Sequence, residues 1–193
     1  MSEITLEPRP ALPFPPLGDM NGALRLTALP QGRLIQALAP AHGTNADLAD
    51  RLTALVHGDP RAVRAYAPGQ WFLVGESPLA PGEITRLAQQ IGGDASLSDQ
   101  SHGRVRVSLE GPAARRVLAK GTAVDLGDTA FPIGRSAQTL FGHIGIHITR
   151  VAPERFELIV LRSFAVSLWD ELTHGSAEFR GDVHPSEPGG ERR

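Results

Sequence analysis

Two short runs of the sequence hold side chains that could do chemistry, and the first is at residues 99–102. Asp99, Ser101 and His102 have the residue types of a hydrolase triad. Three residues so close in the chain do not easily reach the geometry that a nucleophile, a base and an orienting carboxylate need. Asp and Ser side chains also bond nearby backbone donors in turns. We therefore interpret this run as a turn before a strand.

The second run contains His143 and His147, which are spaced four residues apart. The surrounding pattern predicts strands, and on a strand the two imidazoles share a face but lie about 13 Å apart. That separation is too large for one metal ion, and neither a His-Glu-x-x-His motif nor a cysteine supports a metal site. We expect His147 to be solvated or to face a partner.

Several classes of protein are excluded by what the sequence lacks. Its 193 residues contain no cysteine, which excludes a disulfide framework, thiolate metal sites and a cysteine nucleophile. No glycine-rich phosphate loop follows a strand, so the usual sign of a nucleotide site is absent. The net charge of −2 argues against dedicated nucleic-acid binding. With no membrane-spanning run and no signal peptide, we expect a cytoplasmic protein.

Nearly all the basic side chains are arginines: the chain has 18 Arg residues and a single lysine, Lys120. The bias has a compositional explanation, but arginine also makes better bidentate contacts than lysine at interfaces. Arg104, Arg106 and Arg162 therefore become candidate partner contacts. Trp71 is interpreted as a core residue or an interface anchor.

The residues after position 161 suggest a boundary between a buried strand and a helix. Ser163 is suited to cap that helix, and Arg162 beside it could hold an anion or a partner carboxylate. Trp169 falls on the apolar stripe of the same helix, together with Phe164, Leu168 and Leu172. These positions are expected to face the core, and Trp169, like Trp71, is alternatively an interface anchor.

The elements that must position these residues alternate along the chain. Apolar periodicity and turn residues predict strands at 33–39, 62–66, 70–74, 104–110, 136–141, 144–151 and 156–161, and helices at 44–56, 81–91, 112–120 and 163–173. The strict alternation at 104–110 predicts a half-buried strand with Arg104 and Arg106 on its open face. The order predicts an α+β domain of two similar β-α-β halves.

Three regions are expected from composition. Residues 1–20 contain five prolines and form an extended N-terminal arm. Residues 21–178 form the α+β domain. Residues 179–193, rich in Gly, Pro and charge, form a disordered C-terminal tail.

Several segments together resemble a known family. The run Asp99 to Val105 and the run Leu109 to Ala114 are similar to a signature of the aminomethyltransferase-like, folate-binding fold. The wider chain resembles the gamma subunits of heterotetrameric sarcosine oxidases. The matching pieces are Pro68–Leu73, Val124–Leu126, Phe131–Gly134, Ala137–Leu140, Phe156–Val160, Arg162–Phe164 and Leu168–Trp169.

This resemblance implies a function carried by a complex. Such complexes oxidatively demethylate sarcosine and pass the one-carbon unit to tetrahydrofolate. FAD, FMN, NAD and tetrahydrofolate are then expected on partner subunits, with alpha, beta and delta chains as partners. The gamma chain would contribute the fold but no catalytic, cofactor-binding or metal-binding residue.

One departure bears on the alternatives. Folate-using members of the fold carry an acidic pair where this chain has residues 142–147, a segment without a carboxylate. A carboxylate would be needed to tune the protonation of a folate amine. A stand-alone folate-binding aminomethyltransferase is thus disfavoured, and the absence of cysteine excludes the iron–sulfur maturation branch. The equivalent subunit of a related N-methyl amine dehydrogenase stays open.

Overall fold

A computed structural model describes residues 9–18, 22–40, 47–56 and 62–179. The strands are β1 (Arg25–Ala28), β2 (Arg33–Leu38), β3 (Val63–Ala67), β4 (Gln70–Gly75), β5 (Ser96–Asp99), β6 (Arg104–Glu110), β7 (Ser136–Phe141), β8 (Ile144–Ala152) and β9 (Arg155–Leu161). The helices are α1 (Leu48–Leu55), α2 (Glu83–Ile91), α3 (Ala114–Ala119) and α4 (Ala165–Gly175), with short 3-10 turns at Gly92–Asp94, Arg162–Phe164 and Ala177–Phe179.

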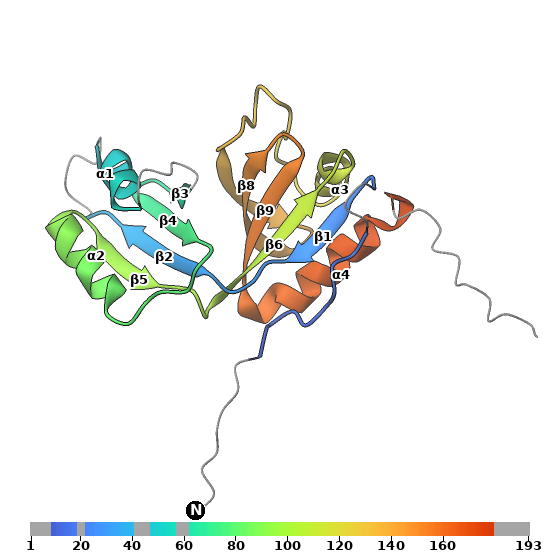
Figure 1. Cartoon of the computed structure of the whole chain (residues 1–193). Helices are drawn as coiled ribbons and strands as arrows, with labels where there is room; N and C mark the ends of the chain where they lie inside the picture. The colour runs from blue at the N-terminus through green and yellow to red at the C-terminus, as the bar shows by residue number, and fades with distance from the viewer. Residues whose placement is uncertain (1–8, 19–21, 41–46, 57–61, 180–193) are drawn as a thin grey trace, which may run out of the picture.

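The strands form two antiparallel sheets. The larger sheet has the order β1-β6-β9-β8-β7, and the smaller has the order β3-β4-β2-β5. The chain passes between them twice, from β1 to β2 and from β5 to β6, and the two connections lie side by side at the bottom centre of Figure 1. The expected α+β class is confirmed.

Helices cover the outer face of each sheet because their apolar stripes match the strands. Leu48 and Leu52 of α1, with Leu87 and Ile91 of α2, pack with Ile35 of β2 in the core of the smaller half. In the larger half, α3 and α4 pack on the isoleucines of β8 and the apolar side chains of β6 and β9. The layers are therefore helix, sheet, sheet, helix (Figure 1).

The inner faces of the two sheets meet in a third, smaller cluster. Leu34, Phe72, Val74 and Ile159 are buried there, and Tyr66 packs against them. This inner layer explains why the expectation for β6 was wrong. Its polar face is not open to solvent, because the second sheet covers it, and Arg106 is only 5% exposed.

Most predicted helices and strands are confirmed, and most of their ends lie within two or three residues of the predicted positions. Two strands were missed. β1 is four residues long, and β5 is a polar edge strand, Ser96-Leu97-Ser98-Asp99. Short strands of this kind carry too little periodicity to be recognised. The capping role of Ser163 is also wrong: the residue lies in a 3-10 turn, Phe164 precedes α4, and no side chain caps the helix.

Part of the predicted N-terminal arm runs along the larger half. Leu12 is buried, and the ring of Phe14 stacks on Trp169 of α4 with centroids 5.6 Å apart. Leu17 forms an isolated antiparallel bridge with Leu26 of β1. Trp169 is in the core, as expected, but Phe164, expected on the same buried stripe, precedes the helix in a 3-10 turn and is 49% exposed. Residues 1–8, and residues 180–193 of the predicted tail, lie outside the described part of the chain.

Gly111 follows the end of β6 and packs closely against the backbone of the segment before β1. Its φ is +117°, a conformation that side chains other than glycine rarely adopt. A Cβ atom there would lie 2.6 Å from the carbonyl oxygen of Ala23. The backbone N–H of Gly111 also donates to the oxygen of Glu154, 2.9 Å away, so the loop cannot easily move aside.

We predict that Gly111→Ala lowers the free energy of unfolding by about 1–3 kcal/mol, from backbone strain alone and more if the overlap cannot relax. Gly93→Ala is the matched control, because nothing lies within 4 Å of a Cβ at Gly93. We expect that control to stay within about 0.5 kcal/mol of the wild type. Equal unfolding midpoints for both variants in urea would contradict the assignment.

Candidate functional site

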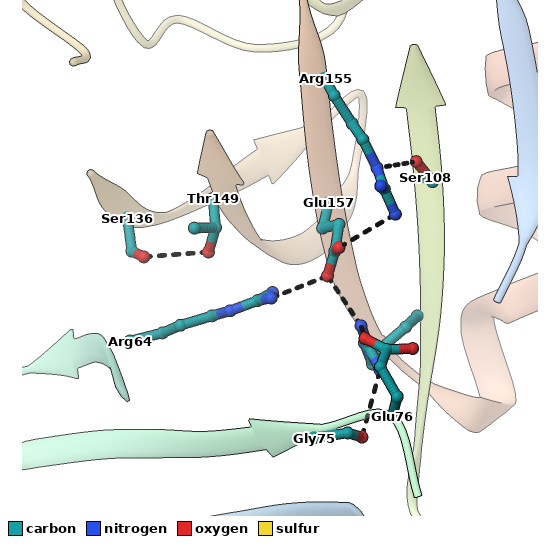
Figure 2. A network of polar contacts seen from close by, with 9 residues as sticks. Arg64, Gly75, Glu76, Ser108, Ser136, Thr149, Arg155 and Glu157 are labelled. Atoms are coloured by element: carbon teal, nitrogen blue, oxygen red, sulfur yellow. Dashed lines mark hydrogen bonds and ion pairs between the residues drawn. The ribbon is translucent and has the colours of Figure 1, made fainter. Parts of the chain in front are cut away.

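A buried carboxylate stands between the two sheets. Glu157 of β9 is 4% exposed. Its Oε2 accepts hydrogen bonds from Arg64 Nη2 of β3 at 2.8 Å and from Arg106 Nη2 of β6 at 3.0 Å. Figure 2 shows Arg64 extending from the smaller sheet to meet Glu157 on the larger one. This ion pair therefore connects the two halves of the molecule.

The network extends beyond these three residues. Arg106 Nη2 also donates to Glu76 Oε1 at 2.7 Å, just past the end of β4. On the other side, Arg155 donates from Nε to Ser108 Oγ at 3.1 Å and from Nη2 to Glu157 Oε1 at 3.5 Å (Figure 2). Both carboxylate oxygens of Glu157 are thus held by guanidinium groups.

The electrostatics of the network keep Glu157 ionised. Burial by itself would raise the pKa of this carboxyl. The charges of Arg64 and Arg106 and their hydrogen bonds outweigh burial and hold the pKa below its usual range. A carboxylate with lowered pKa and both oxygens occupied is a poor general base, so the network is suited to structure rather than proton transfer.

His147 of β8 lies in the same inner layer. It is 1% exposed, and its Nε2 donates to the oxygen of Ala65 at 2.9 Å. The ring meets Phe72 edge-on, with centroids 5.3 Å apart. The expectation of a solvated or partner-facing His147 is wrong, because the smaller sheet covers that face of β8. His143 lies instead in the exposed turn between β7 and β8.

The Asp99 run is a turn, as interpreted. Asp99 Oδ1 accepts from the backbone N–H of Ser101 at 2.9 Å and from its hydroxyl at 2.6 Å. The Ser101 oxygen in turn accepts from the backbone N–H of Leu34 at 3.0 Å. His102 points elsewhere, with Nδ1 2.7 Å from Gln31 Nε2. The three side chains therefore stabilise the connection between β5 and β6 and do not align as a catalytic triad.

Three of the four candidate interface residues meet at one pocket. Arg104, Arg106 and Arg162 line a pocket of about 180 Å³ beside the two connections between the sheets. Arg104 is partly exposed, Arg106 is buried in the network, and Arg162 is exposed. Arg162 follows β9 in a 3-10 turn, where its Nη2 donates to the oxygen of Arg9 at 3.0 Å.

The fourth candidate, Trp71, lies on the other side of the smaller sheet. It is partly buried against the core of the smaller half. It also lines an open groove of about 570 Å³ that runs from β3 and β4 to the start of β7, with Tyr66, Arg135 and Ser136 on its walls. The two hollows share no lining residue, so the four candidates do not form one site.

Sequence reasoning missed Glu157, Arg64 and Arg155. The one signal was a carboxylate inside the apolar run Phe156-Glu157-Leu158-Ile159-Val160, which indicates a buried charge in need of a partner. Within the described residues, no cluster of three or more His, Asp or Glu side chains could hold a metal ion. Nor does that part of the chain contain a helix with the length and hydropathy of a membrane span.

We predict that Glu157→Gln destabilises the protein strongly. The change leaves the buried charges of Arg64 and Arg106 without the carboxylate that they share, which costs about 3–5 kcal/mol when a buried pair is broken. Glu76→Gln removes the other carboxylate on Arg106, but that side chain is 75% exposed, so we expect a loss below about 1 kcal/mol. Denaturant unfolding of both variants tests this, and similar losses would refute it.

A second prediction concerns acid stability. Burial, the largest effect, lowers the pKa of His147 from 6.5 to about 4, so the folded protein binds a proton less readily than the unfolded chain. Stability from this group is complete above pH 6.5 and falls as the pH drops toward 4, by about 3 kcal/mol.

The variant His147→Gln should lose less stability than the wild type over that range. The exposed His143→Gln serves as the control and should keep the wild-type slope. Unfolding free energies measured between pH 7 and pH 4 give the comparison. A slope unchanged by His147→Gln would contradict the assignment.

Comparisons with known proteins give the family. A chain of the heterotetrameric sarcosine oxidase from Corynebacterium sp. U-96, in complex with pyrrole 2-carboxylate, matches with a TM-score of 0.73 and 22% identity, over 86% of this chain and 90% of that one. Aminomethyltransferase T of the glycine cleavage system from Bartonella henselae matches with a TM-score of 0.54 and 19% identity, over 76% of this chain and 44% of that one. No curated protein matches the sequence. Residues 34–178, well over half of the chain, match the model of the sarcosine oxidase gamma subunit family, and the chain belongs to that family.

Proposed function

We propose that this chain is the gamma subunit of a sarcosine oxidase-type heterotetramer and supplies no catalytic group to it. The family match over residues 34–178 is the observation that carries the proposal. The complex would oxidatively demethylate sarcosine and pass the one-carbon unit to tetrahydrofolate. In this proposal FAD, FMN, NAD and tetrahydrofolate bind to the alpha, beta and delta partners, and the complex is cytoplasmic.

The inner layer of the molecule supports a structural role. Its buried carboxylate, Glu157, has both oxygens engaged by arginine side chains. The histidine beside it, His147, is enclosed by Phe72 and Tyr66 and bonded to a backbone oxygen. Groups that are buried and bonded within the fold in this way are poorly placed to bind or protonate a substrate.

The likeness to aminomethyltransferase T supports a second candidate, a stand-alone folate-binding transferase. Such a protein would need a carboxylate able to exchange a proton with a folate amine. Residues 142–147, where we expected that group, contain none. A non-catalytic chain with this fold would equally suit the corresponding subunit of a related N-methyl amine dehydrogenase. In such a complex a catalytic partner subunit would choose the amine.

Co-expression tests the proposal. We expect an affinity-tagged form of this chain, produced together with candidate flavoprotein and small subunits of such a complex, to co-purify with them as a yellow complex that oxidises sarcosine. The chain purified alone should show no flavin absorbance, no sarcosine oxidation and no heat of binding with millimolar tetrahydrofolate.

Two results would overturn this assignment. Failure to recover any flavoprotein with the tagged chain would argue against a subunit role of either kind. Tetrahydrofolate binding by the isolated chain would instead favour the transferase. A complex that oxidises another N-methyl amine but not sarcosine would keep the subunit role and change the substrate.

A further inference from the structure

The pocket beside the two inter-sheet connections has an unusual lining. Residues 29–32 of one connection and Ser101 of the other form part of it, and residues 10–12 of the N-terminal arm also line it. Arg104, Arg106 and Arg162 are among its lining residues, and none of the described residues that line it is an Asp or a Glu. A concave site with cations and no carboxylate of its own favours an anionic occupant.

The three arginines differ in how their charge is satisfied. Arg106 pairs with Glu157 and Glu76, so its charge is balanced within the fold. Within the described residues, neither Arg104 nor Arg162 forms an ion pair, and Arg162 makes one hydrogen bond, to the oxygen of Arg9. The pocket therefore carries two positive charges that the described part of the fold leaves uncompensated.

Arg104 is held in place for contact at this pocket. Its guanidinium carbon lies over the rings of Phe72 and Tyr66, 4.9 and 5.8 Å from their centroids. Its Nε is buried and has no hydrogen-bond partner among the described residues. Stacking fixes the plane of the guanidinium, and its two Nη atoms make no hydrogen bond within the described residues, so these donors, unlike the buried Nε, stay available for a carboxylate.

Several apolar side chains close to Arg162 in the sequence are exposed. Leu161, Phe164 and Val166 are 44%, 49% and 46% exposed, and the first two flank Arg162 in the sequence. Phe14, stacked on Trp169, is another exposed aromatic side chain. Exposed apolar side chains next to a pocket-lining arginine in the sequence are the combination expected of a surface that another protein covers.

We propose that this pocket receives an Asp or Glu side chain of a partner subunit, while apolar neighbours of that residue cover Leu161, Phe164 and Val166. The pocket, at about 180 Å³, is smaller than the roughly 300–1,000 Å³ of most small-molecule sites. Its size thus suits one inserted side chain rather than a free cofactor. The inference rests on the proposed subunit role and assigns it a contact point.

The test uses the complex recovered by co-expression. Arg104→Gln and Arg162→Gln should each weaken the capture of the flavoprotein partner by about tenfold or more at moderate salt, because each leaves the inserted carboxylate poorly paired. Arg104→Lys keeps the charge and should bind better than Arg104→Gln. Arg86→Gln, on the outer helix α2 with a 58% exposed side chain, is the matched control and should bind as the wild type does.

Two further measurements make the outcome decisive. Thermal unfolding of each variant alone shows whether lost capture reflects lost folding, and a melting midpoint equal to that of the wild type is expected for Arg162→Gln. A photoreactive residue placed at position 164 should cross-link to a partner peptide that contains Asp or Glu. Cross-linking only to a segment without a carboxylate would overturn the proposal.

The results also separate this inference from the proposed function. If the wild type captures the flavoprotein and both glutamine variants capture it equally well, the pocket contact is refuted and the subunit role stands. If the wild type captures no flavoprotein, the subunit role and the pocket contact are both refuted. Binding of free acetate or phosphate by the isolated chain, with capture unaffected in the variants, would show a small-anion site and refute the partner contact.

Discussion

The arrangement of this protein depends on one constraint, the burial of Glu157 between two sheets. A carboxylate at that depth is costly unless cations neutralise it. The larger sheet supplies Arg106 and Arg155, and the smaller supplies Arg64. Since the pair Arg64–Glu157 needs both sheets in place, it selects the face and the position at which they meet. Apolar contacts such as Phe72 with Ile159 are less specific about register.

This constraint also shapes what the molecule can do. This chain has a fold similar to that of aminomethyltransferase T. In this chain the inner layer is filled by ion pairs and by His147 with its aromatic neighbours. Under the proposed subunit role, the chemistry would lie with the partner subunits, and the surface would be the functional part of this chain. Arg104 and Arg162, which form no ion pair within the described part of the chain, both line the pocket beside the connections between the sheets. The same layer therefore both closes the interior and presents cations at its edge.

Sequence patterns predicted what depends on local periodicity. The apolar stripes of α2 and α4 and the alternation along β6 and β8 each have a clear period, and the helices and strands followed from them. Alternation shows that a strand has two different faces, but not what covers each one. His147 and Arg106 were therefore placed toward solvent or a partner, although a second sheet covers both. Arg64 and Glu157 are 93 residues apart, and only the fold brings them together.

The excess of arginine over lysine also gains a physical reason. Arg64, Arg106 and Arg150 are each about 5% exposed, and Arg106 and Arg150 each bond two or more groups at once. Arg150 connects the oxygens of Phe131 and Pro153 with the carboxylate of Asp128. A compact, strongly hydrated ammonium lacks the planar fork that such bridges need. Lys120 is used instead where its side chain is 44% exposed, beside Glu178. Whatever set the composition, buried bridging positions in this fold require guanidinium groups.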